Sequence, residues 1–96
     1  MTQYQINLSG VKTYDDFVAA FNVGLIESVG GHWNGNLDDF NDYLYWPEPH
    51  PYGLSLIGWK QCAHILMTLQ AYGGRSMLSA IEEIFADNTQ AELLFA

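Results

Sequence analysis

The side chains with the clearest capacity for chemistry are three aspartates within residues 32–44, which read HWNGNLDDFNDYL. Just before them, Asn36 is a good N-cap residue, because its side-chain oxygen can accept hydrogen bonds from the unpartnered backbone amides of a first helical turn. We therefore expect a helix to begin at Leu37. At about 100° per residue, Asp38 and Asp42 would lie only about 40° apart on its surface. The pattern thus predicts a pair of carboxylates on one helix face.

Two interpretations of this acidic face are open. Acids in a first helical turn interact favourably with the helix dipole, and this effect alone could explain Asp38 and Asp39. Asp42 lies beyond the first turn, where repulsion from Asp38 at spacing i, i+4 costs about 0.2–0.5 kcal/mol. A binding surface would explain Asp42 better than an ordinary helix start does. The apolar positions of the same helix fall on its other side and predict packing there: Leu37, Phe40 and Leu44.

Catalysis and metal binding are weaker interpretations of the same residues. Paired carboxylates can act as acid and base when their surroundings separate their pKa values. However, the chain has no G-x-S-x-G, P-loop or H-E-x-x-H motif that would complete an active site. His32, Asp38 and Asp42 match neither an EF-hand pattern nor a zinc spacing. We therefore expect no enzyme activity, no metal site and no cofactor.

Length and composition indicate one domain spanning residues 1–96. The chain has 96 residues, of which 49% are hydrophobic, so it can build an apolar core without disulfides. Cys62 is the single cysteine and cannot form an internal disulfide. No apolar run approaches the roughly 20 residues of a membrane span, and the N-terminus does not resemble a signal peptide. These features favour a cytoplasmic protein.

The charge is strongly acidic and unevenly distributed. Eleven Asp and Glu residues against three Lys and Arg give a formal net charge of −8. No Lys or Arg lies between Lys12 and Lys60, whereas most of the acids do. Such a field repels nucleic-acid phosphates and anionic membranes, and it accelerates the encounter with a basic protein. We therefore expect a basic protein partner, with no direct binding to nucleic acid or membrane.

The first half of the chain predicts a strand and then two helices. Residues 4–8, YQINL, have strand character and lead into a turn at Ser9-Gly10. Thr13 is a plausible N-cap for a first helix that would run to Gly30-Gly31. Its apolar ridge comprises Phe17, Phe21 and Leu25. The acidic helix follows, and three prolines in WPEPHPYG then predict an extended, stiff connector.

The second half predicts a strand, two helices and a last strand. GLSLIGW resumes strand character near Gly53 and would end at Trp59. QCAHILMTLQAY predicts a helix ended by Gly73-Gly74, and SMLSAIEEIFA predicts a clearer helix capped by Ser76. AELLF then forms the final strand. The order β-α-α-β-α-α-β predicts an α/β fold in which a small three-stranded parallel sheet is packed with about four helices.

At HWNGNLDDFNDYL the chain resembles the barstar family, which are intracellular inhibitors of barnase-type ribonucleases. The NLD at residues 36–38, followed by Asp42, is the most specific part of this likeness. The strand before Trp59 and the segment SMLSAIEEIFADNTQAELLF resemble the family in the same order, so nearly the whole chain is covered. The fold that the resemblance implies agrees with the predicted element order.

The resemblance implies inhibition by occupying the active site of the ribonuclease in a 1:1 complex. An acidic helix and the loop before it would place carboxylates where RNA phosphates bind. Asp42 matches the central binding aspartate of the family, Asp38 a second interface aspartate, and Glu83 an outlying glutamate on the last helix. The partner-binding positions that this implies are His32, Trp33, Asn34, Gly35, Asp38, Asn41, Asp42, Tyr45, Trp46 and Glu83.

The chain also departs from the family pattern. Asn34-Gly35 stands where the family has Gly-Glu, Asn41 replaces a tryptophan, and His32 replaces a tyrosine. A related microbial ribonuclease or a ribonuclease toxin is therefore expected as the partner, rather than barnase itself. For Trp33 and Trp46, the roles of interface anchor and packing residue are both open. The main alternative function is a noncatalytic adaptor that binds a different basic protein through the same acidic face.

Overall fold

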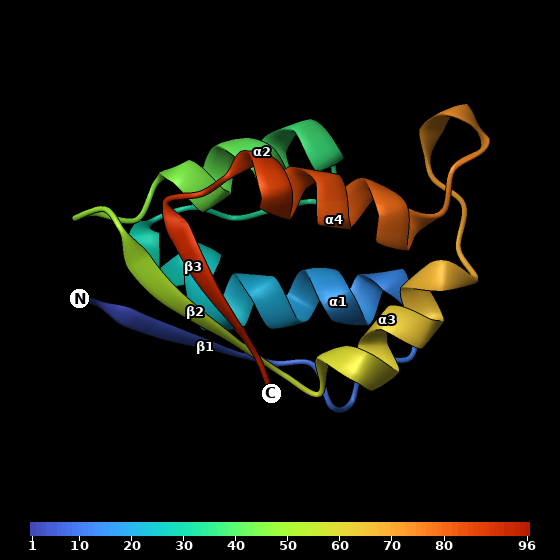
Figure 1. Cartoon of the computed structure of the whole chain (residues 1–96), viewed down its shortest axis with the longest axis horizontal. Coiled ribbons are helices and arrows are strands. Elements are labelled where there is room, and N and C mark those ends of the chain that lie inside the picture. Colours follow the sequence, from blue (N-terminus) through green and yellow to red (C-terminus); the bar gives the residue numbers. More distant parts are fainter.

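Three short strands form the sheet, and the central strand has no exposed residue. The computed structural model describes residues 1–96 and places β1 (Gln3–Asn7), β2 (Tyr52–Ile57) and β3 (Ala91–Phe95) in one parallel sheet, in the order β1-β2-β3 (Figure 1). Tyr4 is aligned with Leu54, which is aligned with Leu93. The parallel arrangement requires each pair of strands to be joined by helical crossovers, as the element order predicts.

Only one face of the sheet is covered. Ile6, Leu54 and Leu56 are buried against the helices, whereas Gln5 and Glu92, which point to the other face, are exposed. The polar residues that alternate along β1 therefore face solvent. This half-covered sheet confirms the predicted three-stranded parallel architecture, packed with four α-helices.

The first helix is divided into three segments. α1 (Tyr14–Phe21) begins at Thr13 with a capping box that Asp16 completes. The chain then widens into the π-helical segment η1 (Asn22–Ile26) and tightens into η2 (Glu27–Val29), which ends at Gly30 with a φ of 89°. The predicted ridge is buried along its whole length, although one regular helix does not carry it. The widened turn begins at Asn22, whose side chain forms hydrogen bonds with the backbone of Trp33.

The acidic helix and the last helix match their predictions closely. α2 (Leu37–Tyr45) begins after Asn36, and α4 (Met77–Asp87) begins after Ser76, whose side chain accepts from the amide of Ser79. Phe40 and Leu44 are buried beneath α2, and α2 packs against α4. Both helices therefore use the apolar side that their sequence periodicity predicts.

Between these two helices, the end of the second strand and both ends of the following helix differ from their predictions. β2 ends at Ile57 instead of Trp59, because Gly58 reverses the chain with a φ of 76° and lies against the backbone of Ser9. Trp59 is the first residue of α3 (Trp59–Met67), which ends well before Gly73. The chain then forms a loop over residues 70–76, closed by a bridge between Gln70 and Ser76, with the short segment η3 (Tyr72–Gly74) at its tip.

The proline-rich connector is bent, which corrects the prediction of an extended segment. Residues 47–51 form successive bends. His50 Nε2 lies 2.7 Å from the carbonyl oxygen of Tyr45, and the two rings pack edge to face at 4.8 Å. These contacts fold the connector back onto the end of α2.

The core is contiguous and rich in aromatic residues. Phe17, Phe21, Trp33 and Phe40 are each at most 1% exposed and pack in mutual contact. Cys62 is buried, and burial raises the pKa of its thiol to about 11. None of the helices is long and apolar enough to cross a membrane.

Gly24 allows η1 to lie directly against β1, and this close approach can be tested. A Cβ atom at Gly24 would lie 2.8 Å from the carbonyl oxygen of Gln5. We expect Gly24→Ala to lower the free energy of unfolding by about 1–3 kcal/mol, because backbone would have to move. Urea denaturation measures this change. Gly10→Ala is the matched control, since nothing lies within 4 Å of its Cβ position; equal effects of the two substitutions would contradict the assigned packing.

Candidate functional site

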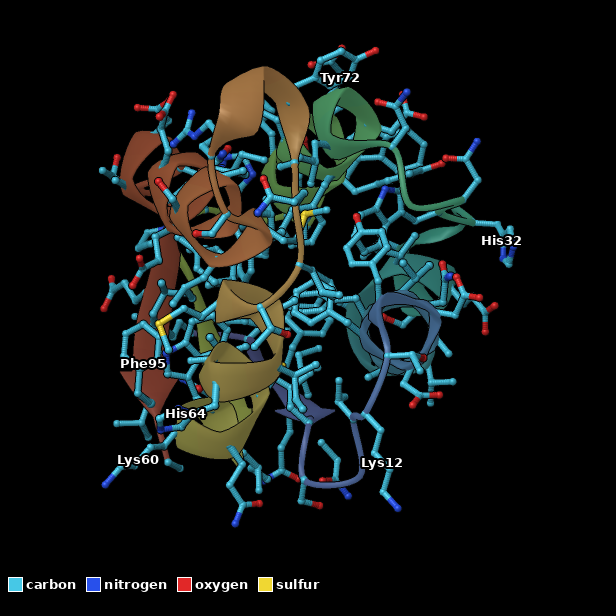
Figure 2. The ribbon with its side chains drawn as sticks, turned by 90° about the vertical axis from the view of Figure 1, so that its right-hand side faces the viewer. Lys12, His32, Lys60, His64, Tyr72 and Phe95 are labelled. Atoms are coloured by element: carbon cyan, nitrogen blue, oxygen red, sulfur yellow. The ribbon has the colours of Figure 1, made fainter.

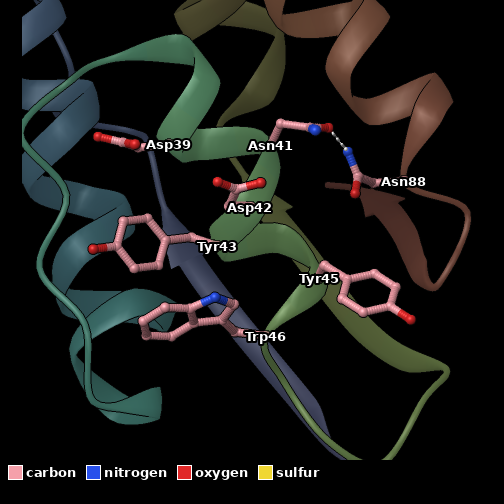
Figure 3. Close-up of a pocket in the computed structure, with 7 residues that line it drawn as sticks. All are labelled: Asp39, Asn41, Asp42, Tyr43, Tyr45, Trp46 and Asn88. Atoms are coloured by element: carbon pink, nitrogen blue, oxygen red, sulfur yellow. Dashed lines mark hydrogen bonds between the residues drawn. The ribbon is translucent and has the colours of Figure 1, made fainter.

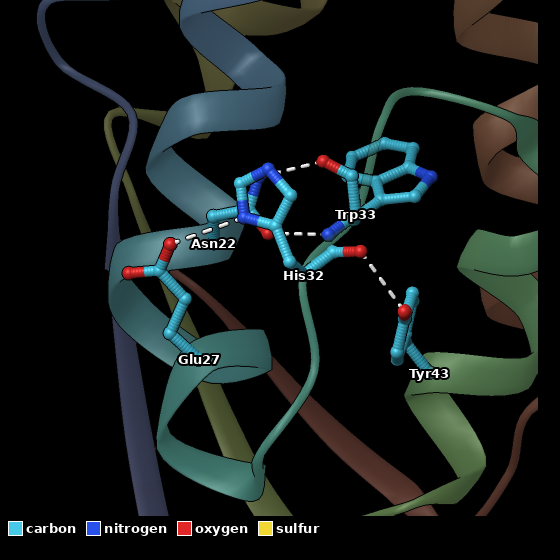
Figure 4. Close-up of polar contacts among 5 residues, drawn as sticks. All are labelled: Asn22, Glu27, His32, Trp33 and Tyr43. Atoms are coloured by element: carbon cyan, nitrogen blue, oxygen red, sulfur yellow. Dashed lines mark hydrogen bonds and ion pairs between the residues drawn. The ribbon is translucent and has the colours of Figure 1, made fainter.

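The loop before α2 is held by Asn22, whose side chain forms hydrogen bonds with both the backbone carbonyl and the backbone amide of Trp33. Asn22 donates from Nδ2 to the Trp33 carbonyl oxygen at 2.8 Å, and its Oδ1 accepts from the Trp33 amide at 2.7 Å (Figure 4). Asn22 is 5% exposed, so water does not compete freely for these bonds. An irregular loop segment thereby gains the backbone partners that a strand would otherwise supply.

Trp33 is a core residue, so of the two roles left open for it the structure supports packing. Its side chain is 1% exposed and stacks on Phe40 with a centroid separation of 4.5 Å. The indole Nε1 donates to the carbonyl oxygen of Asn36 at 2.7 Å, so its polar atom is also used internally. An aromatic residue beside acidic ones suits both packing and binding. Here Trp33 packs in the core beneath α2.

The other residues of the loop are fixed through their backbones while their side chains remain outside. Tyr14 Oη donates to the Gly35 carbonyl oxygen at 2.6 Å, and Tyr43 Oη donates to that of His32 at 2.9 Å. Asn34 Oδ1 accepts from the Asn36 amide at 3.1 Å. The side chains of His32 and Asn34 are therefore displayed from a loop whose shape is already set. Burial raises the pKa of Tyr14 to about 12.

The three aspartates of α2 are exposed and have no cationic partner in the chain. Asn36 Oδ1 accepts from the amide of Asp38 at 2.8 Å, which fixes the first turn beneath these side chains. The only ion pairs of the molecule join Glu27 with His32 and Glu83 with Arg75. The acidic face of α2 is thus free to interact with cations from another molecule.

A hollow of about 380 Å³ lies beside the C-terminal half of α2 (Figure 3). Asp42 lies on this hollow, and the rings of Tyr45 and Trp46 beside it are 62% and 49% exposed. Trp46 is oriented by edge-to-face contact with Tyr43 at 4.7 Å. The hollow therefore combines a negative charge with aromatic surface. Its lining residues are Asp39, Asn41, Asp42, Tyr43, Tyr45, Trp46 and Asn88.

Three of these lining residues were not predicted: Asp39, Tyr43 and Asn88. Asp39 could have been found from the helix, because it lies only about 60° from Asp42 around the axis. Asn88 gave no local signal, since it reaches the hollow from the end of α4. Its Nδ2 donates to Asn41 Oδ1 at 2.6 Å, and Gln90 Nε2 donates to Asn88 Oδ1 at 2.8 Å. Asn41, a predicted partner contact, is thus partly engaged within the fold.

The remaining predicted residues lie outside this hollow. Asp38 borders a second hollow, at the N-terminal end of α2. Glu83 is exposed on α4, but its Oε2 lies 2.7 Å from Arg75 Nη2, so a partner's cation would have to compete with Arg75. No group of three His, Cys, Asp or Glu side chains is placed to hold a metal ion, and His32, Asp38 and Asp42 do not converge.

The double contact of Asn22 can be tested by truncation. Asn22→Ala leaves the amide and carbonyl of Trp33 buried without partners, and we expect a loss of about 2–4 kcal/mol in the free energy of unfolding. Hydrogen exchange should show the Trp33 amide less protected. Asn34→Ala is the control, because its side chain is exposed and makes one hydrogen bond; a loss as large as that of Asn22→Ala would contradict this account.

The contact between Tyr14 and Gly35 predicts an alkaline dependence of stability. The Tyr14 pKa is about 12 in the folded protein, whereas tyrosine in an unfolded chain titrates near 10. Its contribution is therefore fully present below about pH 10 and falls as the pH rises toward 12. We expect Tyr14→Phe to make unfolding free energy less dependent on pH in this window, as measured by urea denaturation at several pH values. Identical slopes for both proteins would refute the assignment.

We define the candidate site as the acidic face of α2, the braced loop of residues 32–36 and the hollows at the two ends of α2. A scan against protein-family models found no family that matches this chain, and a search of curated proteins found no matching relative.

Proposed function

We propose that this protein inhibits a barnase-type microbial ribonuclease or a ribonuclease toxin by covering its active site in a 1:1 complex. The observation that carries the proposal is the set of exposed aspartates on α2, which have no internal cation and follow a loop fixed by buried side chains. The proposal also rests on the resemblance of residues 32–44 to the barstar family.

The chemistry of a ribonuclease active site explains why carboxylates would inhibit it. A ribonuclease active site must carry Arg, Lys and His to bind phosphate and to stabilise charge that develops during cleavage. The carboxylates of Asp38 and Asp42 can satisfy the same donors through charge-assisted hydrogen bonds, which are shorter and stronger than neutral ones. Occupation of these donors excludes RNA without any chemical step.

The rigidity of the candidate site supports tight binding. Ordering a loop upon association costs free energy that is subtracted from the gain of its contacts. Here Asn22, Tyr14 and Tyr43 already bind the loop backbone in the free protein. A partner would therefore meet His32, Asn34 and Gly35 in a preformed arrangement.

The individual residues would contribute unequally. Asp42 would be central, because it lines the same hollow as the exposed aromatic rings of Tyr45 and Trp46. Asp38 would act one turn earlier, and Asn41 would contribute with the atoms that Asn88 leaves free. Glu83 would contribute less than Asp42, since Arg75 already neutralises it. Trp33 would act indirectly by supporting the loop.

The charge distribution supports rapid encounter with a basic partner. Lys12 and Lys60 lie toward the opposite end of the molecule from Tyr72 and α2, as Figures 1 and 2 show. The acidic face is thereby separated from two of the three cations, and a net charge of −8 extends the attraction. Association should slow as salt increases. We place this activity in the cytoplasm, where it would protect the cell's own RNA.

The proposal can be tested by titrating the protein into a panel of microbial guanyl-preferring ribonucleases and following RNA cleavage. We expect stoichiometric inhibition of at least one member. Asp42→Ala should weaken it by about 2–5 kcal/mol, because an unpaired partner charge would remain buried. Glu48→Ala is the matched control, since Glu48 is an exposed acid in the connector outside the hollow. Circular dichroism checks that each variant is folded.

Equal losses of inhibition for Asp42→Ala and Glu48→Ala would contradict the central role of Asp42 in binding. Absence of inhibition across the panel would count against the ribonuclease inhibitor and favour the noncatalytic adaptor, which would bind another basic protein through the same face.

A further inference from the structure

The second hollow lies between the start of α2 and the loop of residues 70–76. Its volume is about 600 Å³, and it is continuous with the acidic face because Asp38 belongs to both. Asp38 is the one charged residue in its lining, while Leu37 and Met77 supply apolar surface. The lining residues are Gly35, Asn36, Leu37, Asp38, Gln70, Ala71, Tyr72 and Met77.

Tyr72 is the feature of this hollow that the fold does not explain. Its residue surface is 93% exposed, although most of the aromatic residues are packed in the core. The ring pairs with no other aromatic ring, and its hydroxyl makes no hydrogen bond within the chain. Figure 2 shows the ring projecting from the end of the molecule at which α2 lies. Folding therefore gains little from a tyrosine at this position.

The loop nevertheless holds Tyr72 in a defined place. Ala71 donates from its amide to the Arg75 carbonyl oxygen at 2.9 Å, and Gln70 pairs with Ser76 in a short bridge. Gly73 adopts a left-handed conformation with a φ of 72°, which lets the chain turn sharply behind the tyrosine. Binding through this ring would need less ordering than binding through a free loop.

The only charge in the lining of the hollow is the negative charge of Asp38. Arg75, the only cation of the loop, is held by Glu83 at 2.7 Å and by the Ser79 carbonyl oxygen at 3.1 Å, and it does not line the hollow. An incoming cation would therefore meet Asp38 without competition from the chain's own arginine. The face of the Tyr72 ring adds attraction, because a guanidinium group binds favourably over an aromatic ring.

We propose that this hollow binds an arginine side chain of the same basic partner that α2 contacts. The Tyr72 ring would cover the guanidinium, Asp38 would provide its counter-charge, and Leu37 and Met77 would contact its aliphatic stem. The inference rests on the proposed function, since the arginine belongs to that partner. It adds a contact element, the loop of residues 70–76, that lies outside α2 and the loop before it.

Affinity measurements with the ribonuclease that is inhibited most strongly test the proposal. We expect Tyr72→Ala to raise Kd about 3- to 30-fold, as for the loss of one cation–π contact, and Tyr72→Phe to stay close to wild type. Leu94→Ala is the control, because Leu94 is exposed on β3, away from the hollow. If one arginine contacts both residues, the double variant Asp38→Ala, Tyr72→Ala should lose less than the product of the single losses.

A second measurement uses no ribonuclease. In an NMR titration of the whole protein with acetyl-Gly-Arg-Gly-amide, we expect saturable shifts of the Asp38, Tyr72 and Met77 amides, which a citrulline-containing peptide does not produce. Unchanged affinity of Tyr72→Ala for an inhibited ribonuclease would overturn the inference and leave the proposed function intact. If the panel is not inhibited, arginine-specific shifts at the hollow would support the inference alone, and their absence would overturn it.

Discussion

The burial of Trp33 is the constraint on which the rest of the structure depends. Its indole stacks on Phe40 from α2 and meets Phe17 and Phe21 from α1 edge to face. One side chain thus fixes the distance between α1 and α2 and the position of the loop that joins them. Because the Trp33 backbone is bound by Asn22, the loop cannot move without disturbing the core. The shape of the outer surface is determined from the inside.

The two sides of α2 serve separate purposes. Phe40 and Leu44 supply the packing that holds the helix in place, while its aspartates are exposed and make no ion pair within the chain. The acidic side carries repulsion between its own charges, which packing on the other side offsets. Such a division lets the charged surface change without loss of the fold. It also explains why the exposed aspartates lack internal partners, whereas Glu27 and Glu83 on other elements have them.

The sequence predicted those elements whose signals are local. Asn36 and Ser76 cap their helices as expected, and the residues of β3 are those of the predicted strand. Predictions failed where tertiary contacts compete with local preference. The first helix widens at Asn22, whose side chain leaves to bind Trp33, and α3 ends early because the next residues close a loop through Gln70 and Ser76. The hollow beside Asp42 contains Asn88, which no spacing within α2 could indicate.

The hydrogen bonds between Asn41, Asn88 and Gln90 have a consequence for when the surface exists. They join the middle of α2 to the segment just before β3, so residues 47 positions apart in the chain meet at the hollow. Such distant contacts form only after the intervening chain has been ordered. During synthesis on the ribosome, α2 can be complete before Asn88, which lines the hollow, has been added to the chain. The surface therefore becomes whole only when almost the entire polypeptide has emerged, which makes it a property of the finished molecule.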